Sequence, residues 1–255
     1  MLSAQQIIDY KADKNLLKDH VILITGAGDG IGKAAALAFA EVGAQLILAG
    51  RTTAKLEQVY DQIVAADYSE PTLYPIDLEG ATIEDYEQLA VGIDKQFGRL
   101  DGLLLNAGIL GQRTPLSNYR TDVWDKVIKV NVTSQFQMTQ SLMPVLEKSQ
   151  SASIVFTSSG VGQVGRAFWG AYAVSKFAVE GMVQTWAAEL EGLNNVRINC
   201  INPGATATSM RAQAYPAENP QSIASAEQIM PAYLYLMGQD SQQINGQSIN
   251  AQKPK

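Results

Sequence analysis

Residues 21–32 read Val21-Ile22-Leu23-Ile24-Thr25-Gly26-Ala27-Gly28-Asp29-Gly30-Ile31-Gly32 and are the part of the chain most indicative of its fold. A short apolar run enters a glycine-dense turn, and the turn leads into an alanine-rich helical segment. Glycines let the backbone turn tightly and approach a pyrophosphate, which binds to free amides at the helix N-terminus. The spacing is G-x-x-x-G-x-G through Gly26, Gly30 and Gly32, not G-x-G-x-x-G. The stretch therefore predicts a dinucleotide-binding strand, turn and helix; the alternative is a flexible glycine loop.

Outward from this unit, short apolar runs alternate with longer helical patterns, which predicts a parallel sheet built from right-handed βαβ units. Apolar stripes predict helices over 31–42 and 83–97, each ended by a glycine. Longer helices are predicted over about 121–147 and 170–191, and Ser225 with Gln228 is a candidate cap for a last one. The predicted strands are Val21–Thr25, Gln45–Ala49, Leu73–Ile76, Gly102–Leu105, Ser153–Thr157, Arg197–Ile201 and Gln247–Asn250.

These elements fill the chain and leave no room for a separate substrate domain. We expect one α/β domain over residues 1–255, a Rossmann-like doubly wound parallel sheet, with a short helical arm over residues 1–18. Ligands of such sheets bind beyond the carboxyl ends of the strands. The motifs at Gly26, Gly50, Asp77, Asn106, Ser159 and Pro203 each follow a predicted strand. Their common position predicts a single site.

Ser159, Tyr172 and Lys176 are the candidate catalytic residues. Tyr172 and Lys176 are spaced i and i+4, so they lie one turn apart on one face of a helix. There the ammonium favours the phenolate and lowers a phenol pKa that is ordinarily about 10. Ser159, at the end of a preceding strand, can meet the phenol at a substrate oxygen. The trio suits carbonyl reduction, whereas a lone Tyr-x-x-x-Lys pair is more often helix surface.

Six ordered motifs resemble those of the single-domain short-chain dehydrogenases/reductases, from about residue 17 to about residue 250. They are Thr25-Gly26-x-x-x-Gly30-Ile31-Gly32, Asn106-Ala107-Gly108, Asn131, Ser159, Tyr172-x-x-x-Lys176 and Pro203-Gly204. The resemblance implies a nicotinamide cofactor and Ser–Tyr–Lys chemistry, with Tyr172 as the acid. It also implies that Lys176 holds the nicotinamide ribose and that Asn131, a fourth candidate catalytic residue, positions a water near Lys176. Without the resemblance, Asn131 is equally well a polar residue inside a helix.

The resemblance assigns cofactor contacts within each motif. Asp77 would accept from the adenine amino group beside Leu78, although a turn aspartate is the alternative. Thr208 would hold the carboxamide, and Thr206 would contribute backbone contacts. The family's commoner motif is Asn-Asn-Ala-Gly, and Leu105 stands at the position of its first asparagine. That asparagine joins neighbouring strands in the family, and apolar packing of Leu105 is expected to replace this role. The candidate cofactor-binding residues are Gly26, Gly28, Asp29, Gly30, Ile31, Gly32, Arg51, Asp77, Leu78, Asn106, Ala107, Gly108, Tyr172, Lys176, Pro203, Gly204, Thr206 and Thr208.

The end of the second predicted strand favours NADP(H) over NAD(H). A NAD enzyme usually has an acidic residue there for the ribose 2′-hydroxyl, but this chain has Gly50 and Arg51. A guanidinium suits a 2′-phosphate, and a solvent-facing arginine is the alternative. Asp29 is the contrary observation, because many NADP-dependent relatives carry Lys or Arg at that position. NADP is therefore the expected cofactor and NAD the less favoured one.

Composition excludes several classes of function. A net charge of −6 and a pI near 4.9 argue against a nucleic-acid partner. His20 is the only histidine, so neither a Ser-His-Asp triad nor a histidine-rich metal site is expected. Cys200 is expected to be a small core residue, and a single cysteine suits a reducing cytoplasm. The chain shows neither a transmembrane-length apolar run nor a secretory leader, so a cytoplasmic protein with no membrane partner is expected.

The sequence thus predicts an oxidoreductase that transfers a hydride between NADP(H) and a carbonyl or secondary alcohol. Three alternatives stay open: a regulatory protein that binds NADP without chemistry, a NAD-dependent dehydrogenase, and an epimerase or dehydratase of the extended branch. The resemblance also points to a homodimer or homotetramer formed through the helices over about 121–147 and 170–191. Met182 and Trp186 are the candidate contact residues, with burial inside the subunit as the alternative.

Apolar side chains are expected around the reacting carbon, namely Ile109, Leu110, Val161, Val164, Phe168 and Trp169. Such a pocket favours a substrate with an apolar or aromatic body. Arg166 and Arg211 are the contrary observation, since either could clamp a carboxylate. The segment of about 209–224, with Met210 and Tyr215, is the expected lid over this pocket.

Overall fold

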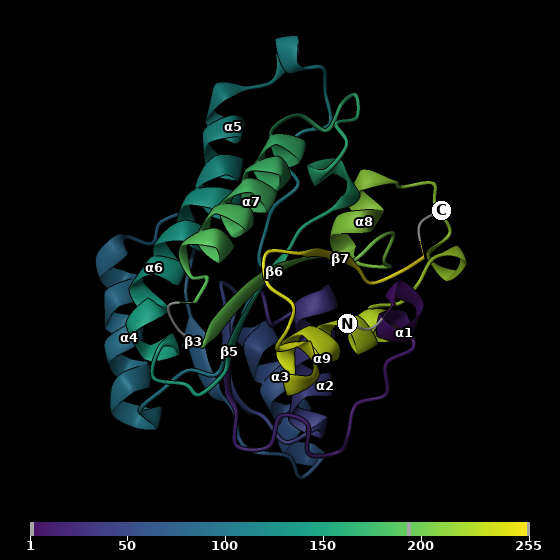
Figure 1. Ribbon diagram of the computed structural model, residues 1–255. Helices are drawn as coiled ribbons and strands as arrows, with labels where there is room; N and C mark the ends of the chain where they lie inside the picture. The colour runs from purple at the N-terminus through teal and green to yellow at the C-terminus, as the bar shows by residue number, and fades with distance from the viewer. Residues whose placement is uncertain (1–2, 193–194, 254–255) are drawn as a thin grey trace.

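The computed structural model describes residues 3–192 and 195–253. Within them, seven parallel strands form one sheet in the order β3-β2-β1-β4-β5-β6-β7 (Figure 1). The strands are β1 Val21–Thr25, β2 Gln45–Gly50, β3 Thr72–Pro75, β4 Gly102–Leu105, β5 Ala152–Thr157, β6 Val196–Asn202 and β7 Ser248–Asn250. All the predicted strands are confirmed, and none of their ends differs from the prediction by more than one residue.

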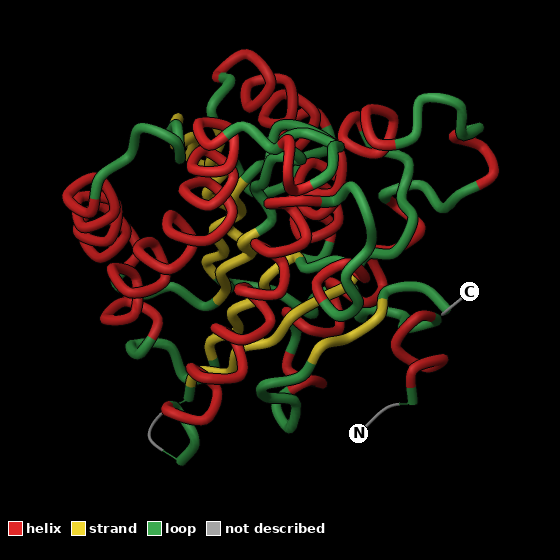
Figure 2. The backbone as a smooth tube through the Cα atoms, turned by 90° about the horizontal axis from the view of Figure 1, so that it is seen from above, coloured by secondary structure: helices red, strands yellow, loops and turns green. Residues whose placement is uncertain are grey.

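Helices cover both faces of the sheet (Figure 2), and each face has its own core. The α-helices are α1 Ala4–Ile8, α2 Gly30–Glu41, α3 Thr53–Ala65, α4 Ile83–Phe97, α5 Thr121–Ile128, α6 Ser134–Leu146, α7 Gly170–Glu189, α8 Ser209–Ala214 and α9 Met230–Met237. In β1, Ile22 and Ile24 face the core of α2, α3 and α9, while Leu23 faces the core of α4, α6 and α7. Burial on both faces explains why the strands are apolar throughout.

The order of the strands reverses beside β1, which pairs with β2 on one side and with β4 on the other. Loops that leave the carboxyl ends of β1 and β4 therefore diverge to opposite faces of the sheet. This divergence opens a crevice at the point where doubly wound sheets bind ligands. The topology thus places the glycine turn after β1 and the loop after β4 side by side.

Helix ends follow the local sequence. The backbone N–H of Thr82 donates to Asp85 at 2.8 Å to begin α4, and Gly98 ends the helix with a φ of 76°. The predicted cap at Ser225 and Gln228 forms, with a Ser225 N–H to Gln228 bond of 2.8 Å. It opens a 3₁₀ turn, Glu227–Ile229, that continues into α9.

The helix predicted over about 121–147 forms as one unbroken helical run from Thr121 to Leu146, but a π-helical turn at Lys129–Thr133, which the sequence did not predict, separates α5 from α6. The N-terminal arm holds α1, and its Ile7 and Leu17 are buried in the core formed with α2 and α9. Residues 1–2 of the arm lie outside the described residues. Among the described helices, none combines the length and the apolar character needed to span a bilayer.

Candidate active site

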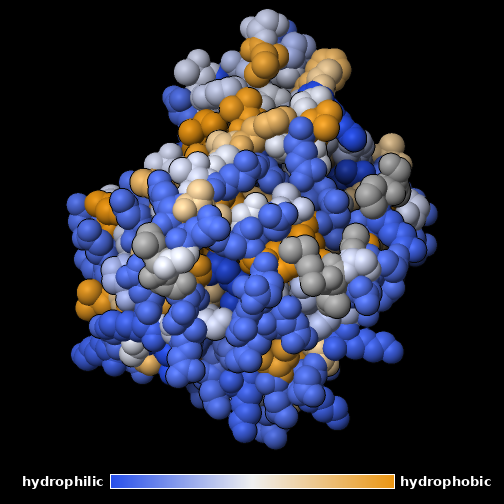
Figure 3. All heavy atoms as spheres, in the orientation of Figure 1, coloured by the Kyte–Doolittle hydropathy of each residue, from blue (hydrophilic) through white to orange (hydrophobic). Residues whose placement is uncertain are grey.

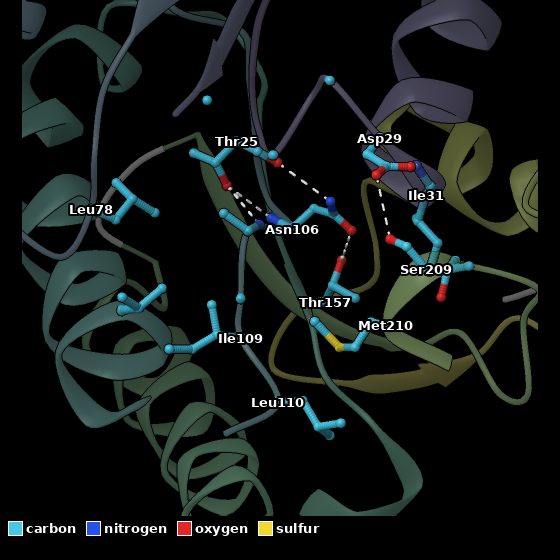
Figure 4. A pocket seen from close by; sticks show the side chains of 18 of the residues that line it. Thr25, Asp29, Ile31, Leu78, Asn106, Ile109, Leu110, Thr157, Ser209 and Met210 are labelled. Carbon is cyan, nitrogen blue, oxygen red and sulfur yellow. Dashed lines mark hydrogen bonds between the residues drawn. The ribbon is translucent and has the colours of Figure 1, made fainter. Parts of the chain in front are cut away.

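A cavity of about 500 Å³ lies at the carboxyl ends of the strands, with walls from the loops after β1 to β6. Figure 4 shows part of this lining, with side chains from the glycine turn, from the loops after β3 and β4, and from α8. The lining includes Ser159 and every candidate cofactor-binding residue except Gly32. The motifs that the sequence separates by up to 180 positions therefore share one cavity.

Gly26 and Gly32 shape the glycine turn, and of the two Gly26 also lines the cavity. Gly26 has a φ of 68°, in the left-handed region that favours glycine. A Cβ on Gly32 would lie 2.2 Å from the carbonyl oxygen of Gly26. Gly32 is thus outside the cavity lining, and its missing side chain lets the first turn of α2 pack against the turn before it.

Asn106 joins three strands beneath the cavity. The hydroxyl of Thr25 accepts from the backbone N–H groups of Asn106, at 3.0 Å, and of Ala107, at 3.1 Å. The Asn106 side chain donates to the Thr25 carbonyl at 3.4 Å and accepts from the Thr157 hydroxyl at 3.3 Å (Figure 4). Leu105 is fully buried in the core, as expected where packing replaces an asparagine.

The π-helical turn presents Asn131, which is fully buried behind the cavity wall. Its side chain accepts from the N–H of Ile109 at 2.8 Å and donates to the carbonyl of Ile109 at 3.0 Å. It also donates to the Ser175 hydroxyl at 3.0 Å. A Cβ on Gly108 would lie 3.2 Å from the Asn131 oxygen and 3.8 Å from the Lys176 ammonium. Asn131 and Lys176 therefore both lie against the same side of Gly108.

Tyr172 and Lys176 occupy one face of the first turns of α7 and are both buried. The Lys176 ammonium donates to the carbonyl oxygen of Thr157 at 2.7 Å and lies 5.6 Å from the centre of the Tyr172 ring. Burial raises the pKa of Tyr172 to about 12, and a hydrogen bond with Ser159 acts in the opposite direction. Three of the four candidate catalytic side chains, those of Ser159, Tyr172 and Lys176, are thus brought together at the end of β5.

The direction of the Tyr172 pKa is opposite to the one that the Tyr-x-x-x-Lys spacing predicts. Desolvation of a phenolate at this depth outweighs the ammonium, which points at a backbone carbonyl. Burial also lowers the pKa of Lys176 to about 8, while Cys200 and Glu180 act to raise it. At neutral pH the site therefore holds a neutral phenol beside a mostly protonated lysine, which is the state of a proton donor.

Lys55, at the start of α3, also lines the cavity, and sequence reasoning missed it. Its ammonium lies 2.6 Å from the Asp29 carboxylate. Asp29 caps α2 by accepting from the N–H of Gly30 at 2.7 Å, and it accepts from the Ser209 hydroxyl of α8 at 3.3 Å (Figure 4). The hydrogen bond from Lys55 lowers the pKa of Asp29. The carboxylate that counted against NADP is therefore paired with a cation.

An apolar wall faces Tyr172. Leu110, Val161, Trp169, Ala173 and Ala214 form a buried cluster with it, and Met210 packs against the cluster. The prediction for Val164 and Phe168 is wrong, because these side chains are 65% and 54% exposed and do not line the cavity. Phe168 has a φ of 71°, a backbone turn that the residue pattern does not reveal.

Two arginines flank this wall, and each has partners. Arg211 forms two bonds of 2.6 Å with Glu218 and lies 3.8 Å from the centre of the Tyr215 ring. Arg113, which sequence reasoning missed, stacks against the rings of Trp169 and Tyr215, at 4.8 and 4.9 Å, and donates to the carbonyl of Ala214. Arg166 is exposed and does not line the cavity. Within the described ranges, no group of His, Cys, Asp and Glu residues is arranged to hold a metal ion.

The parallel sheet, the glycine turn and the Ser–Tyr–Lys site define an oxidoreductase fold of the dinucleotide-binding class. A profile of the short chain dehydrogenase family matches residues 20–219, and the chain therefore belongs to that family of oxidoreductases. It is 49% identical to the oxidoreductase YciK of Escherichia coli (strain K12) over 243 residues, 95% of this chain and 96% of that protein.

Solved structures agree with this assignment. A short chain dehydrogenase from Pseudomonas syringae is 56% identical, with a TM-score of 0.94, over 96% of this chain and 99% of that one. Another, from Escherichia coli CFT073, is 49% identical, with a TM-score of 0.92, over 95% of this chain and 100% of that one. The latter structure contains NADPH.

Proposed function

We propose that this protein is an NADP-dependent oxidoreductase that transfers a hydride between NADP(H) and a carbonyl or secondary alcohol. The observation that carries the proposal is the meeting of Ser159, Tyr172 and Lys176 in the cavity that the glycine turn also lines. A protein that only senses the nucleotide would not need a buried phenol with a buried lysine one turn away. A buried ammonium is expensive, and chemistry gives a reason to keep it.

Each residue then has a separate task. In the reductive direction, Tyr172 donates its phenolic proton to the substrate oxygen, and Ser159 donates a hydrogen bond to the same atom. Lys176 holds the nicotinamide ribose and favours the phenolate that forms. Asn131 holds the loop after β4 through Ile109 and keeps Gly108 against Lys176. NADPH supplies the hydride when it is bound.

The residues present fit a bound dinucleotide. Gly26, Gly28 and Gly30 line the cavity at the N-terminus of α2 and leave room for a pyrophosphate close to the backbone. Arg51 and Lys55 line the far end of the cavity, at the start of α3, where they can bind a 2′-phosphate. The NADPH complex of the Escherichia coli CFT073 relative supports this choice of cofactor. A calorimetric titration tests it: Arg51→Ala and Lys55→Ala should each weaken NADPH binding about tenfold and leave NADH binding unchanged.

The substrate is a carbonyl compound with an apolar or aromatic body. Leu110, Trp169, Met210 and Ala214 line the cavity near Tyr172, and they offer it apolar surface. Arg211 already forms an ion pair with Glu218, which argues against a role for Arg211 in binding a substrate carboxylate. Figure 3 shows hydrophobic side chains gathered over the upper ends of α5 and α7, on the same side of the molecule as the predicted lid.

The lid and the assembly complete the proposal. Residues of α8, including Ser209, Met210 and Ala214, line the cavity, which supports the segment of about 209–224 as a lid that excludes water during hydride transfer. A homodimer or homotetramer through α6 and α7 is supported by exposed aromatic side chains on those helices. The buried free thiol of Cys200 supports a reducing, cytoplasmic location.

Tyr172→Phe is the decisive variant, assayed by NADPH oxidation with aromatic ketones and with short keto acids. Loss of the proton donor should lower turnover about 10²–10⁴-fold and leave the NADPH dissociation constant within about twofold, because the ring still packs. Tyr68→Phe, at an exposed tyrosine of the loop after α3, is the matched control and should behave as the unmodified protein. A Tyr172→Phe enzyme with half of its activity would show that another group is the acid.

A further inference from the structure

A third residue continues the catalytic face of α7. Tyr172, Lys176 and Glu180 are spaced at i, i+4 and i+8, so they form one stripe along the helix. Their partners are three consecutive residues at the end of β5. Ser159 bonds to Tyr172, the carbonyl of Thr157 accepts from Lys176 at 2.7 Å, and the hydroxyl of Ser158 donates to Glu180 at 2.6 Å.

Glu180 is a buried carboxyl group, with 8% of its surface exposed. The same oxygen that accepts from Ser158 also accepts from the Ser248 hydroxyl of β7 at 2.9 Å. No lysine or arginine of the described chain lies within 4.0 Å of it as an ion-pair partner. A buried carboxylate without a contacting cation is expensive, which calls for a role beyond packing.

We propose that Glu180 is a positioning residue of the active site. Its negative charge keeps the Lys176 ammonium protonated, and its bond to Ser158 fixes the strand end so that Thr157 and Ser159 face Lys176 and Tyr172. This inference rests on the proposed function in one respect, because it takes Ser159, Tyr172 and Lys176 as the catalytic residues. The contacts of Glu180 themselves are independent of any substrate.

The effect of the Glu180 charge on Lys176 can be judged from the titratable groups that lie near Lys176. Tyr172 on the same helix and Cys200 on β6 are both neutral near pH 7, since their ordinary pKa values lie above 7 and burial raises them further. Glu180 is the carboxyl group that acts on Lys176 from within the described structure, and its effect is to raise the pKa of Lys176. Since burial leaves that pKa at about 8, removal of the opposing charge should move it toward or below neutrality.

Nuclear magnetic resonance on protein labelled with ¹³C at the lysine ε-carbon tests this directly. The Lys176 signal is assigned as the one missing from Lys176→Arg, and its titration midpoint is measured without cofactor or substrate. Glu180→Gln, which keeps the size but not the charge, should lower the midpoint by about one pH unit. Ser248→Ala, which removes one donor and keeps the charge, is the control and should not lower it.

A second variant separates charge from folding. Glu180→Asp keeps the charge, so its Lys176 midpoint should stay near that of the unmodified protein even where thermal stability falls. An unchanged midpoint in Glu180→Gln, or an equal fall in Glu180→Asp, would overturn the proposal.

Activity supplies the second readout. In Glu180→Gln, the alkaline limb of kcat/KM for NADPH-dependent ketone reduction should move to lower pH, with a loss of about tenfold above pH 8. An unmodified protein that turns over no carbonyl compound would refute the proposed function but leave the measured effect of Glu180 on Lys176 intact. A superimposable pH profile in an active Glu180→Gln enzyme would refute the role of Glu180 instead.

Discussion

Lys176 is a site residue whose burial is costly to the fold. It is 3% exposed, and burial lowers its pKa from an ordinary value of 10.5 to about 8. The unfolded chain therefore binds this proton below about pH 10.5, whereas the native protein binds it only below about pH 8. Between these values native stability should rise with pH, because the cost of burying the ammonium disappears as it deprotonates.

Lys176→Met should accordingly stabilise the protein at pH 7 by about 1–2 kcal/mol, less than the full pKa shift implies because the Thr157 carbonyl loses its donor. The advantage should shrink as pH rises from 8 toward 10.5, where the unmodified lysine is neutral in both states. Urea unfolding at pH 7 and pH 10 measures the difference, with the exposed Lys95→Met as the control. A variant less stable than the parent at pH 7 would contradict the argument.

The gathering of the candidate site residues in one cavity was predictable, but their electrostatics were not. Ser159, Asn106 and Pro203 follow apolar runs, and the strand-end rule for parallel sheets is enough to bring them together. The pKa direction of Tyr172, the pairing of Lys55 with Asp29 and the burial of Glu180 depend on how helices pack on the sheet. The periodicity of apolar residues identifies which face of a helix is turned toward the core, but not how deeply the residues of that face are buried.

At the scale of elements, the C-terminal segment supports a loop of the site. The Gln252 side chain donates to the carbonyl oxygens of Pro203 at 2.7 Å and Ala205 at 2.9 Å. Gly204, with a φ of 71°, packs so closely that a Cβ would lie 2.9 Å from the Gln252 amide nitrogen. The segment after β7 therefore holds the loop after β6 in its cavity-facing conformation.

Gln252→Ala should weaken NADPH binding about fivefold to tenfold, because two hydrogen bonds of about 1 kcal/mol each are lost from a loop that lines the cofactor cavity. The turnover number at saturating NADPH should change less, since the proposed catalytic residues lie on other elements. Fluorescence titration of NADPH measures the effect. Gln247→Ala, which removes a side chain that donates to the nearby Asn245 carbonyl at 3.3 Å, is the control. Equal NADPH affinities in the two variants would dismiss the role of Gln252.

The π-helical turn marks the limit of sequence-based prediction for an element. The residues of about 121–147 read as one continuous helix, and no glycine or proline interrupts them near Asn131. The turn persists because the Asn131 side chain bonds to Ile109 and Ser175, which lie on distant segments. A π turn of this kind often marks a functional site, but only the fold reveals the bonds that hold it.

At the scale of the whole molecule, the sheet was predictable because each strand is buried on both faces and therefore apolar throughout. The outer surface of α6 and α7 is different, since it carries apolar side chains that the fold does not cover. Phe136 and Phe177 are 42% and 45% exposed, and Val174 is 40% exposed. Phe136 also stacks on Trp186 at a ring distance of 5.6 Å.

Exposed aromatic residues on two neighbouring helices commonly mark a protein–protein interface. We therefore expect a homodimer or homotetramer in which this surface meets its equivalent in a second copy, as a two-fold axis requires. Size-exclusion chromatography with light scattering at micromolar concentration should give a mass at least twice that of one chain. Phe136→Glu combined with Phe177→Glu should reduce the mass of a homodimer to that of the monomer, because the paired charges would be buried without partners.

Val91→Glu, on the exposed side of α4, is the matched control and should leave the mass unchanged, although Val91 is 67% exposed and equally apolar. The contrast matters because a lone exposed apolar residue needs no partner, whereas stacked aromatic side chains on adjacent helices do. A monomeric parent protein at these concentrations would refute the interface. A double variant that keeps the mass of the parent would instead place the contact on another face of the molecule.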